Sequence, residues 1–271
     1  MPELPEVQTT LTGIQPHILG RKIQAVVIRE HRLRWPINPE LPEILAGQTL
    51  DSLTRRGKYL LLGTKRGTLI LHLGMSGSLR IFTKATPPGK HDHIDLIFAP
   101  NICLRLRDPR RFGACVWTDA DPLQHALLKH LGPEPFNEDF SGDYLWELSR
   151  KRKVPIKSFI MDSKTVVGVG NIYAAEALFA SGIKPTKPAG KVSLASYNTL
   201  AKAIREILQA AIQQGGTTLK DFVNSDGAEG YFSLKLNVYG RGGLLCRHCK
   251  TILKEMRLGQ RSTVYCGHCQ S

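Results

Sequence analysis

The sequence predicts an α+β protein with an N-terminal two-layer β-sandwich and flanking helices, a helical second domain, and a small C-terminal β-hairpin. Three features indicate this fold class. Short β-rich runs fill most of the first 118 residues, helical patterns take over after about residue 120, and four of the six cysteines fall within the last 26 residues. A chain of 271 residues can bury two cores and carry a small appendage.

The first expected element is an amphipathic helix. Val7, Leu11, Ile14 and Ile18 recur at intervals of three and four residues, which places them on one helix face. Two prolines at the start of this segment suit a first helical turn, where a missing N–H does no harm.

Strands are expected between about residue 23 and residue 118. Short apolar runs alternate there with Gly, Pro and Asp, at a spacing that is typical of a sandwich. The predicted strands are Gln24–Ile28, Tyr59–Leu62, Thr68–His72, Ser78–Phe82, His93–Phe98, Ile102–Arg107 and Ala114–Thr118.

The pattern becomes helical near Asp119. The predicted helices are Pro122–His130, Asp143–Arg152, Ile156–Met161, Ile172–Ser181 and Leu194–Gln214. The segment Gly132-Pro133-Glu134-Pro135 interrupts regular structure and is the predicted linker. We therefore expect domains at residues 1–131, 132–235 and 236–271.

The composition favours a polyanionic partner. Lys and Arg number 37 against 23 Asp and Glu, which gives a formal net charge of +14. No run approaches the roughly 18 apolar residues of a membrane span. The acidic, proline-bearing start lacks the features of a secretory signal. We therefore expect a cytoplasmic protein that binds nucleic acid and not a membrane.

The C-terminal cysteines have the spacing of a zinc site. Cys246 and Cys249 form one Cys-x-x-Cys pair, Cys266 and Cys269 form another, and 16 residues separate the pairs. Four thiolates complete a tetrahedron, so the histidines inside the pairs are left out of the ligand set. One structural Zn²⁺ with no open coordination position is expected.

The predicted finger is basic. Residues 241–271 carry six Arg and Lys against one acidic residue. These charges could bind phosphates or could merely solvate a hairpin too small to bury them. Arg261 lies at the expected hairpin turn between the two cysteine pairs, where its guanidinium could hold a phosphate by two hydrogen bonds.

A second candidate phosphate site is the segment Val166–Ala174. Its glycines permit a tight turn, and Asn171 suits the cap of the following helix, whose N-terminus would attract an anion. The motif alone could equally be an ordinary helix–turn–helix corner. A basic run at residues 150–157 lies upstream, and together the two features predict a surface for a DNA backbone.

The chain start could supply a nucleophile. Removal of Met1 would leave Pro2 as a secondary amine, and an α-amino group is less basic than lysine and can form a Schiff base. Glu3 could transfer protons beside it. By themselves, however, these residues are also ordinary helix-start residues that complement the helix dipole.

Six motifs in one order resemble the formamidopyrimidine-DNA glycosylase family, over essentially the whole chain. They are the finger and the segments Pro2–Val7, Arg55–Leu60, His72–Gly77, Asp108–Gly113 and Gly168–Tyr173. The resemblance implies a two-domain fold with a helix–two-turn–helix motif and a zinc finger. It also implies a bifunctional enzyme that removes oxidised purines, 8-oxoguanine and formamidopyrimidines, and then cuts the abasic site by β- and δ-elimination.

The resemblance carries the family's catalytic roles to individual positions. Pro2 matches the nucleophile that attacks the sugar C1′, and Glu3 matches its acid/base partner. Lys58 matches the lysine assigned to proton transfer in β-elimination. Arg261 matches the finger arginine that clamps phosphates and is associated with δ-elimination.

DNA contacts follow in the same way. Met75, Arg110 and Phe112 match the side chains that fill the gap left by a flipped nucleotide, although an apolar pair in glycine-rich loops could also be packing residues. Residues 220–231 resemble the loop that closes over the extruded base. The positions expected to contact DNA are His72, His91, Arg110, Arg152, Lys157, Asn171 and Tyr173.

The expected partner is double-stranded DNA that contains oxidised purines or abasic sites, bound by a monomer. The one departure from the opening motif is Gln8, where the family has a glutamate. Two alternatives stay open. One is an endonuclease VIII-type glycosylase for oxidised pyrimidines, which Leu4 and the gap-filling set argue against. The other is a zinc-finger protein that only binds DNA, which Pro2, Glu3 and Lys58 argue against.

Overall fold

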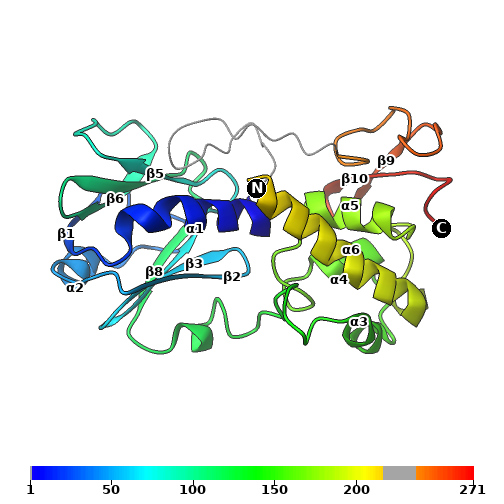
Figure 1. The fold of residues 1–271 in the computed structure, drawn as a ribbon, viewed down its shortest axis with the longest axis horizontal. Coiled ribbons are helices and arrows are strands. Elements are labelled where there is room, and N and C mark those ends of the chain that lie inside the picture. Colours follow the sequence, from blue (N-terminus) through cyan, green and yellow to red (C-terminus); the bar gives the residue numbers. More distant parts are fainter. Residues whose placement is uncertain (1, 216–235) are drawn as a thin grey trace. The chain divides into compact units, whose positions relative to one another are not determined.

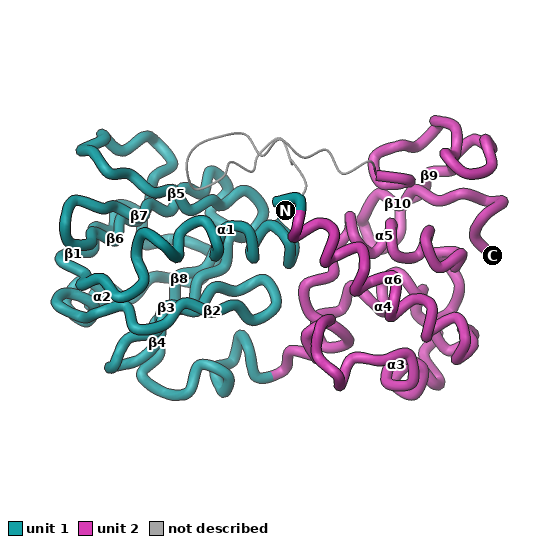
Figure 2. The backbone as a smooth tube through the Cα atoms, in the orientation of Figure 1, with its two compact units in different colours: residues 1–129, 214–232 teal, residues 130–213, 233–271 magenta. Residues whose placement is uncertain are grey.

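The computed structural model describes residues 2–215 and 236–271. Figure 2 colours two compact units: unit 1 comprises residues 1–129 and 214–232, and unit 2 comprises residues 130–213 and 233–271. The cysteine-bearing C-terminal segment thus belongs to the same compact unit as the helices.

Unit 1 is built around two four-stranded antiparallel sheets (Figure 1). The first has the order β1-β6-β7-β5, with strands β1 (Ile23–Ile28), β6 (Asp92–Phe98), β7 (Ile102–Arg107) and β5 (Ser78–Phe82). The second has the order β2-β3-β4-β8, with strands β2 (Ser52–Arg56), β3 (Tyr59–Thr64), β4 (Gly67–His72) and β8 (Ala114–Thr118).

One apolar core joins the elements of unit 1. Alternate strand residues such as Leu60, Leu71 and Leu104 are buried in it. Helix α1 (Leu4–Ile18) contributes Val7, Leu11, Ile14 and Ile18 to this core and packs against strands of both sheets, because its apolar side chains recur on one face. A short helix α2 (Leu41–Leu45) packs beside β1.

Unit 2 combines helices with a two-stranded hairpin. The helices are α3 (Gly142–Ser149), α4 (Ile156–Met161), α5 (Asn171–Ala180) and α6 (Leu194–Gln213), and the hairpin strands are β9 (Lys254–Leu258) and β10 (Arg261–Tyr265). Helix α5 is buried along almost its whole length and packs against α4, α6 and β10. No described helix has the length and apolar character that a bilayer span requires.

The predicted sandwich is confirmed, and all seven predicted strands are present, some one or two residues longer than expected. The structure adds β2 and α2, which the sequence analysis did not predict. The helix predicted at Pro122–His130 is wrong. Only a 3₁₀ turn, Pro122–Gln124, forms there. The Asp121 carboxylate caps its start by accepting the Leu123 N–H at 2.9 Å, but the backbone is extended at His125 and turns follow.

Candidate functional site

The start of the described chain is buried in unit 1. Glu3 occupies the N-cap position of α1 and is 2% exposed, and Pro2 is also buried. The Glu3 N–H donates to the Glu6 carboxylate at 2.8 Å, and the Val7 N–H donates to the Glu3 carbonyl at 3.1 Å. Glu3 and Glu6 form a reciprocal capping box, in which each carboxylate accepts the backbone N–H of the other residue. The first turn of α1 therefore fixes both the backbone beside Pro2 and the Glu3 side chain.

Lys58 lies in the turn Arg56-Gly57-Lys58-Tyr59, here called the lysine turn, which joins β2 to β3. Gly57 has φ +58°, which a side chain would disfavour, and a glycine at the first central position is typical of a type II′ hairpin turn. Arg55 donates from Nη1 to the Gly57 carbonyl at 2.9 Å and thereby braces the turn.

Gln8 connects the lysine turn to helix α1. Its Oε1 accepts a hydrogen bond from Arg55 Nε at 3.0 Å. The same guanidinium also donates to the Gly57 carbonyl. Gln8, the one residue that departs from the opening motif, therefore helps to position Lys58 relative to α1. The sequence marked Gln8 only as a departure from the family motif and did not indicate this contact.

His72 ends β4 opposite Tyr59, with a distance of 4.7 Å between the two ring centroids. Burial and, to a smaller extent, the positive charges of Lys58 and Arg34 together lower the pKa of His72 to about 4. Its Nδ1 accepts the Gly74 N–H at 2.9 Å, which requires an unprotonated Nδ1. The neutral imidazole therefore holds the start of the loop that carries Met75.

The loops that carry Met75 and Arg110 are tied together by Asp108, which is 0% exposed. Its Oδ1 accepts from Ser76 Oγ at 3.0 Å and from the Arg110 N–H at 3.3 Å, and its Oδ2 accepts the Gly113 N–H at 2.8 Å. The sequence analysis quoted Asp108 only as part of a motif. An acidic residue directly before Pro-Arg-Arg would have been a signal for this role.

The same two loops approach each other closely at Gly74. This residue has φ +63°, and a Cβ there would lie 2.4 Å from the Phe112 carbonyl carbon. Arg110 and Phe112 are exposed, Phe112 to 43%, and the Arg110 guanidinium stacks over the Phe112 ring at 4.8 Å. Met75 is half-buried. Phe112 thus projects into solvent from a rigidly held loop, as a side chain that is inserted between base pairs requires.

In unit 2, the glycine-rich segment leads into α5 as predicted, but Gly170 takes the N-cap position and Asn171 is the first helical residue. Asn171 Nδ2 donates to the Ser262 carbonyl at 3.2 Å. Its Oδ1 is buried and has no hydrogen-bond partner among the described residues. Tyr173 is buried in the unit.

The basic run at 150–157 divides into exposed and buried members. Lys151, Arg152 and Lys153 are exposed and available to a phosphate backbone. Arg150 instead donates to the Trp146 and Val192 carbonyls at 2.9 and 3.1 Å. Lys157 is 1% exposed, and its Nζ donates to the Ser262 carbonyl at 3.1 Å and to Thr263 Oγ1 at 2.8 Å.

The four C-terminal cysteines converge on one point. Their Sγ atoms all lie within 4.8 Å of one another, with 3.4 Å between those of Cys249 and Cys266 and 4.0 Å between those of Cys246 and Cys269. A tetrahedral zinc with Zn–S bonds of about 2.3 Å requires separations of about 3.8 Å. The cluster therefore fits one structural Zn²⁺ as predicted.

Arg261 is the last residue of the tight turn Leu258-Gly259-Gln260-Arg261, here called the arginine turn, which joins β9 to β10. Gly259 and Gln260 both have positive φ, of 54° and 61°, as a type I′ turn requires. Arg261 is exposed.

Glu176 is a further residue that the sequence analysis missed. It lies on the otherwise apolar helix α5, is 4% exposed, and accepts the backbone N–H groups of Asn237, Val238 and Tyr239 at 2.8 to 2.9 Å. One buried carboxylate thus anchors the chain that enters the finger. A lone acid within an apolar helical run was the available signal.

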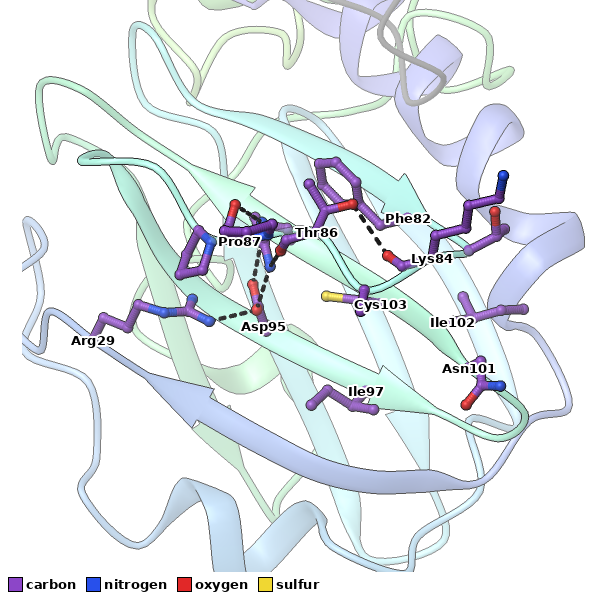
Figure 3. Close-up of a pocket in the computed structure, with 14 residues that line it drawn as sticks. Arg29, Phe82, Lys84, Thr86, Pro87, Asp95, Ile97, Asn101, Ile102 and Cys103 are labelled. Carbon is purple, nitrogen blue, oxygen red and sulfur yellow. Dashed lines mark hydrogen bonds and ion pairs between the residues drawn. The ribbon is translucent and has the colours of Figure 1, made fainter.

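A hollow of about 900 Å³ opens on the outer face of the first sheet of unit 1 (Figure 3). Asp95 at its base accepts from Arg29 at 2.6 Å and from Arg105 Nε at 2.7 Å. Burial raises the pKa of Asp95, but these hydrogen bonds outweigh that effect and lower it. Cys103 is half-buried here, and burial raises its pKa to about 11. The charged side chains in the hollow are thus paired with one another, and we interpret them as a structural network.

The structure thus groups the predicted residues into two sets. Unit 1 holds Pro2, Glu3, Lys58, His72, Met75, His91, Arg110 and Phe112, and unit 2 holds Arg152, Lys157, Asn171, Tyr173, Arg261 and the four cysteines. The predicted closing loop, residues 220–231, lies outside the described residues.

Comparisons with known proteins cover the whole chain. Residues 1–115 match the formamidopyrimidine-DNA glycosylase N-terminal domain, residues 131–223 its H2TH domain, and residues 243–271 the zinc finger found in FPG and IleRS. The formamidopyrimidine-DNA glycosylase of Stutzerimonas stutzeri (strain A1501) is 56% identical over 270 residues, covering 100% of both chains.

Solved structures agree. The MutM (Fpg) protein of Thermus thermophilus has a TM-score of 0.88 at 34% identity, covering 99% of this chain and 98% of its own. The Lactococcus lactis Fpg in complex with DNA that contains an abasic site has a TM-score of 0.90 at 35% identity, covering 99% of both. With three domain matches in order and relatives aligned along their full length, the chain belongs to the formamidopyrimidine-DNA glycosylase family.

Proposed function

We propose that this protein is a bifunctional base-excision repair enzyme of the bacterial cytoplasm. It removes 8-oxoguanine and formamidopyrimidines from double-stranded DNA and then cleaves the strand at the resulting abasic site. The observation that carries the proposal is the buried start of unit 1, where Glu3 caps α1 beside Pro2 and the Gln8–Arg55 contact links the same helix to the lysine turn.

The first chemical step assigned to this site is base excision. Once Met1 is removed, the Pro2 nitrogen attacks the sugar C1′, and the bond to the damaged base breaks. Opening of the sugar ring needs a proton at the ring oxygen, which we assign to the Glu3 carboxyl group. The product is an iminium ion between Pro2 and the open sugar.

Strand cleavage follows from the iminium. Loss of a C2′ proton, which we assign to Lys58, expels the 3′ phosphate in β-elimination. A second elimination, which we associate with Arg261, expels the 5′ phosphate. Hydrolysis then releases the sugar fragment and restores the Pro2 amine. Zinc supplies no step here; it holds the finger that presents Arg261.

The exposed loop of unit 1 supports recognition by base flipping. We assign Phe112 and Met75 to filling the stack, and Arg110 to hydrogen bonding with the unpaired base opposite, which would favour cytosine. Asp108 and Gly74 hold this loop in one shape. His72, His91, Arg152 and Asn171 are assigned to the DNA-contacting surfaces. Tyr173, which is 1% exposed, is assigned to the same surface through its backbone at the start of α5.

Borohydride trapping on a duplex with 8-oxoguanine opposite cytosine tests the proposal. The wild-type protein, with removal of Met1 verified by intact mass, should give a covalent adduct that peptide mass analysis places at Pro2. Pro2→Gly and Glu3→Gln should lose most of the adduct, whereas Pro5→Ala, a change at a nearby proline, should keep it. No adduct from the wild-type protein would instead favour a protein that only binds DNA.

A lesion panel separates the two glycosylase classes. Faster excision of 8-oxoguanine than of oxidised pyrimidines supports the proposal, and the reverse order favours an endonuclease VIII-type enzyme. Gel filtration of the protein with its DNA tests the expectation of a monomer.

A further inference from the structure

We infer that Lys157 is a positioning residue for Arg261 and does not itself contact a DNA phosphate. The effect on strand cleavage rests on the proposed function, whereas the contact between Lys157 and the hairpin does not. It replaces the expectation from sequence that Lys157 binds DNA directly.

The Lys157 side chain is buried, unlike those of its neighbours in the basic run. Lys157 is 1% exposed, whereas Lys151, Arg152 and Lys153 of the same basic run are exposed. Lysine is almost never fully buried unless its ammonium group is engaged, because desolvation of the charge must be offset. A phosphate could reach this ammonium only if the surrounding side chains moved.

The Lys157 ammonium group is connected to the backbone of Arg261 through Thr263. Lys157 Nζ donates to Thr263 Oγ1 at 2.8 Å, and the Thr263 hydroxyl donates in turn to the Arg261 carbonyl at 3.3 Å. A two-bond relay therefore runs from helix α4 to the backbone of Arg261. Thr263 is itself buried, so this relay is shielded from water.

Two side chains, those of Lys157 and Asn171, donate hydrogen bonds to the same backbone carbonyl, that of Ser262. The Ser262 carbonyl accepts from Lys157 Nζ at 3.1 Å and from Asn171 Nδ2 at 3.2 Å. Side chains from α4 and from the start of α5 thus hold the residue that follows Arg261. Ser262 Oγ also donates to the Glu255 carboxylate at 2.7 Å, across the hairpin.

The hairpin needs such support because it buries little apolar surface. Of its ten strand residues, only Thr263 and Val264 are buried. The arginine turn joins the two strands at one end of the hairpin. The four cysteines lie at the other end, before the start of β9 and after the end of β10. We therefore assign to Lys157 the local ordering of the arginine turn, which zinc alone leaves less constrained.

Hydrogen–deuterium exchange on the zinc-loaded, DNA-free protein tests the contact directly. Lys157→Met keeps the apolar stem and removes the charge, and Thr263→Val keeps the shape and removes the hydroxyl. Both should raise amide exchange at residues 255–265 by about tenfold, since a hydrogen bond to a charged donor contributes roughly that factor. Thr263→Ser, which keeps the hydroxyl, should stay near the wild-type rate.

The double variant Lys157→Met/Thr263→Val sharpens this measurement. If the two residues act through one relay, the double variant exchanges no faster than the stronger single variant. Wild-type exchange rates in either single variant would overturn the inference, whatever the protein does to DNA.

DNA binding and cleavage test the consequence. Lys157→Met should leave the dependence of log affinity on log salt concentration unchanged, whereas Arg152→Met should reduce its slope by about 0.9, the value for one lost phosphate contact. Both Lys157→Met and Thr263→Val should lower the ratio of δ- to β-elimination product. A slope that falls by about 0.9 in Lys157→Met would overturn the inference, while failure of the proposed function would show as no cleavage by the wild-type protein.

Discussion

Two hairpin turns carry predicted cationic site residues, and they are supported in different ways. The lysine turn of unit 1 extends from strands whose side chains, such as Leu53, Leu60 and Leu62, are buried in the sandwich core. The arginine turn of unit 2 extends from strands that are mostly exposed and is held by four cysteines and a few polar contacts. The position of Lys58 thus depends on apolar packing, and that of Arg261 depends on a metal and on individual hydrogen bonds.

This difference bears on how each turn responds to change. An apolar core spreads its stabilisation over many side chains, so the lysine turn should be lost only when the whole sandwich unfolds. A metal-held hairpin can open by itself, because the apolar cluster that joins it to α5 is small, with only Ala175 and Phe179 contributed by the helix.

Removal of zinc should have the largest effect. Structural zinc contributes about 10–16 kcal/mol to the folding of isolated fingers, so a strong chelator should unfold residues 236–271 and abolish DNA binding. The sandwich should keep its β-sheet circular dichroism and its slow amide exchange. Added Zn²⁺ should restore binding, and unaltered DNA binding by metal-free protein would contradict this account.

Leu60→Ala should have the next largest effect, and it should act on unit 1. Leu60 is completely buried in strand β3, beside the lysine turn, and truncation should reduce the free energy of unfolding by about 2–5 kcal/mol. Urea unfolding followed by tryptophan fluorescence measures this loss. Leu245→Ala, at an exposed position in the finger, is the control and should change stability by less than about 0.5 kcal/mol.

The sequence predicted the sandwich well because its strands are short apolar runs, mostly buried, that lie between clear turn signals. Strand β2 was missed because Ser52, Thr54 and the arginines around Leu53 leave only one buried side chain. The helix at Pro122–His130 was predicted because Leu123, Leu127 and Leu128 mimic a helical repeat, yet Leu123 is exposed and the backbone turns extended at His125, where the 3₁₀ turn ends.

The candidate site divides in the same way. The zinc ligands could be predicted because their spacing alone specifies the chemistry. The supporting contacts of Gln8, Asp108, Glu176 and Lys157 could not, because each joins residues distant in sequence or depends on where a buried polar group finds its partners. A basic run looks uniform in sequence, and only burial separates Lys157 from Arg152.

Glu176→Gln should have an intermediate effect, confined to unit 2. The carboxylate accepts three backbone N–H groups, and a neutral amide can replace only part of this arrangement. We expect a loss of about 1.5–3 kcal/mol and weaker retention of zinc in a chelator competition. Glu147→Gln on the exposed face of α3 is the matched control. Equal zinc retention in the two variants would show that the finger does not depend on this anchor.

The smallest effect concerns the pH dependence of unit 1. The folded pKa of His72 is about 4, below its unfolded value of about 6.5, because of burial and then the charges of Lys58 and Arg34. Between these values the unfolded chain binds a proton that the folded chain does not, so stability falls as pH falls from about 6.5 toward 4. At pH 5.5 the contribution is a loss of about 1.4 kcal/mol relative to pH 8.

Urea unfolding at the two pH values, compared between wild type and His72→Gln, isolates this contribution, since glutamine can accept the Gly74 N–H but does not titrate. Lys58→Met should raise the His72 pKa, because it removes one of the two neighbouring positive charges, and an NMR titration of the imidazole measures that shift. An unchanged His72 pKa would mean that the lysine turn does not hold its ammonium group beside the ring in solution. The lysine turn would then be less well fixed by the sandwich core than the arginine turn is by zinc and its buried polar contacts.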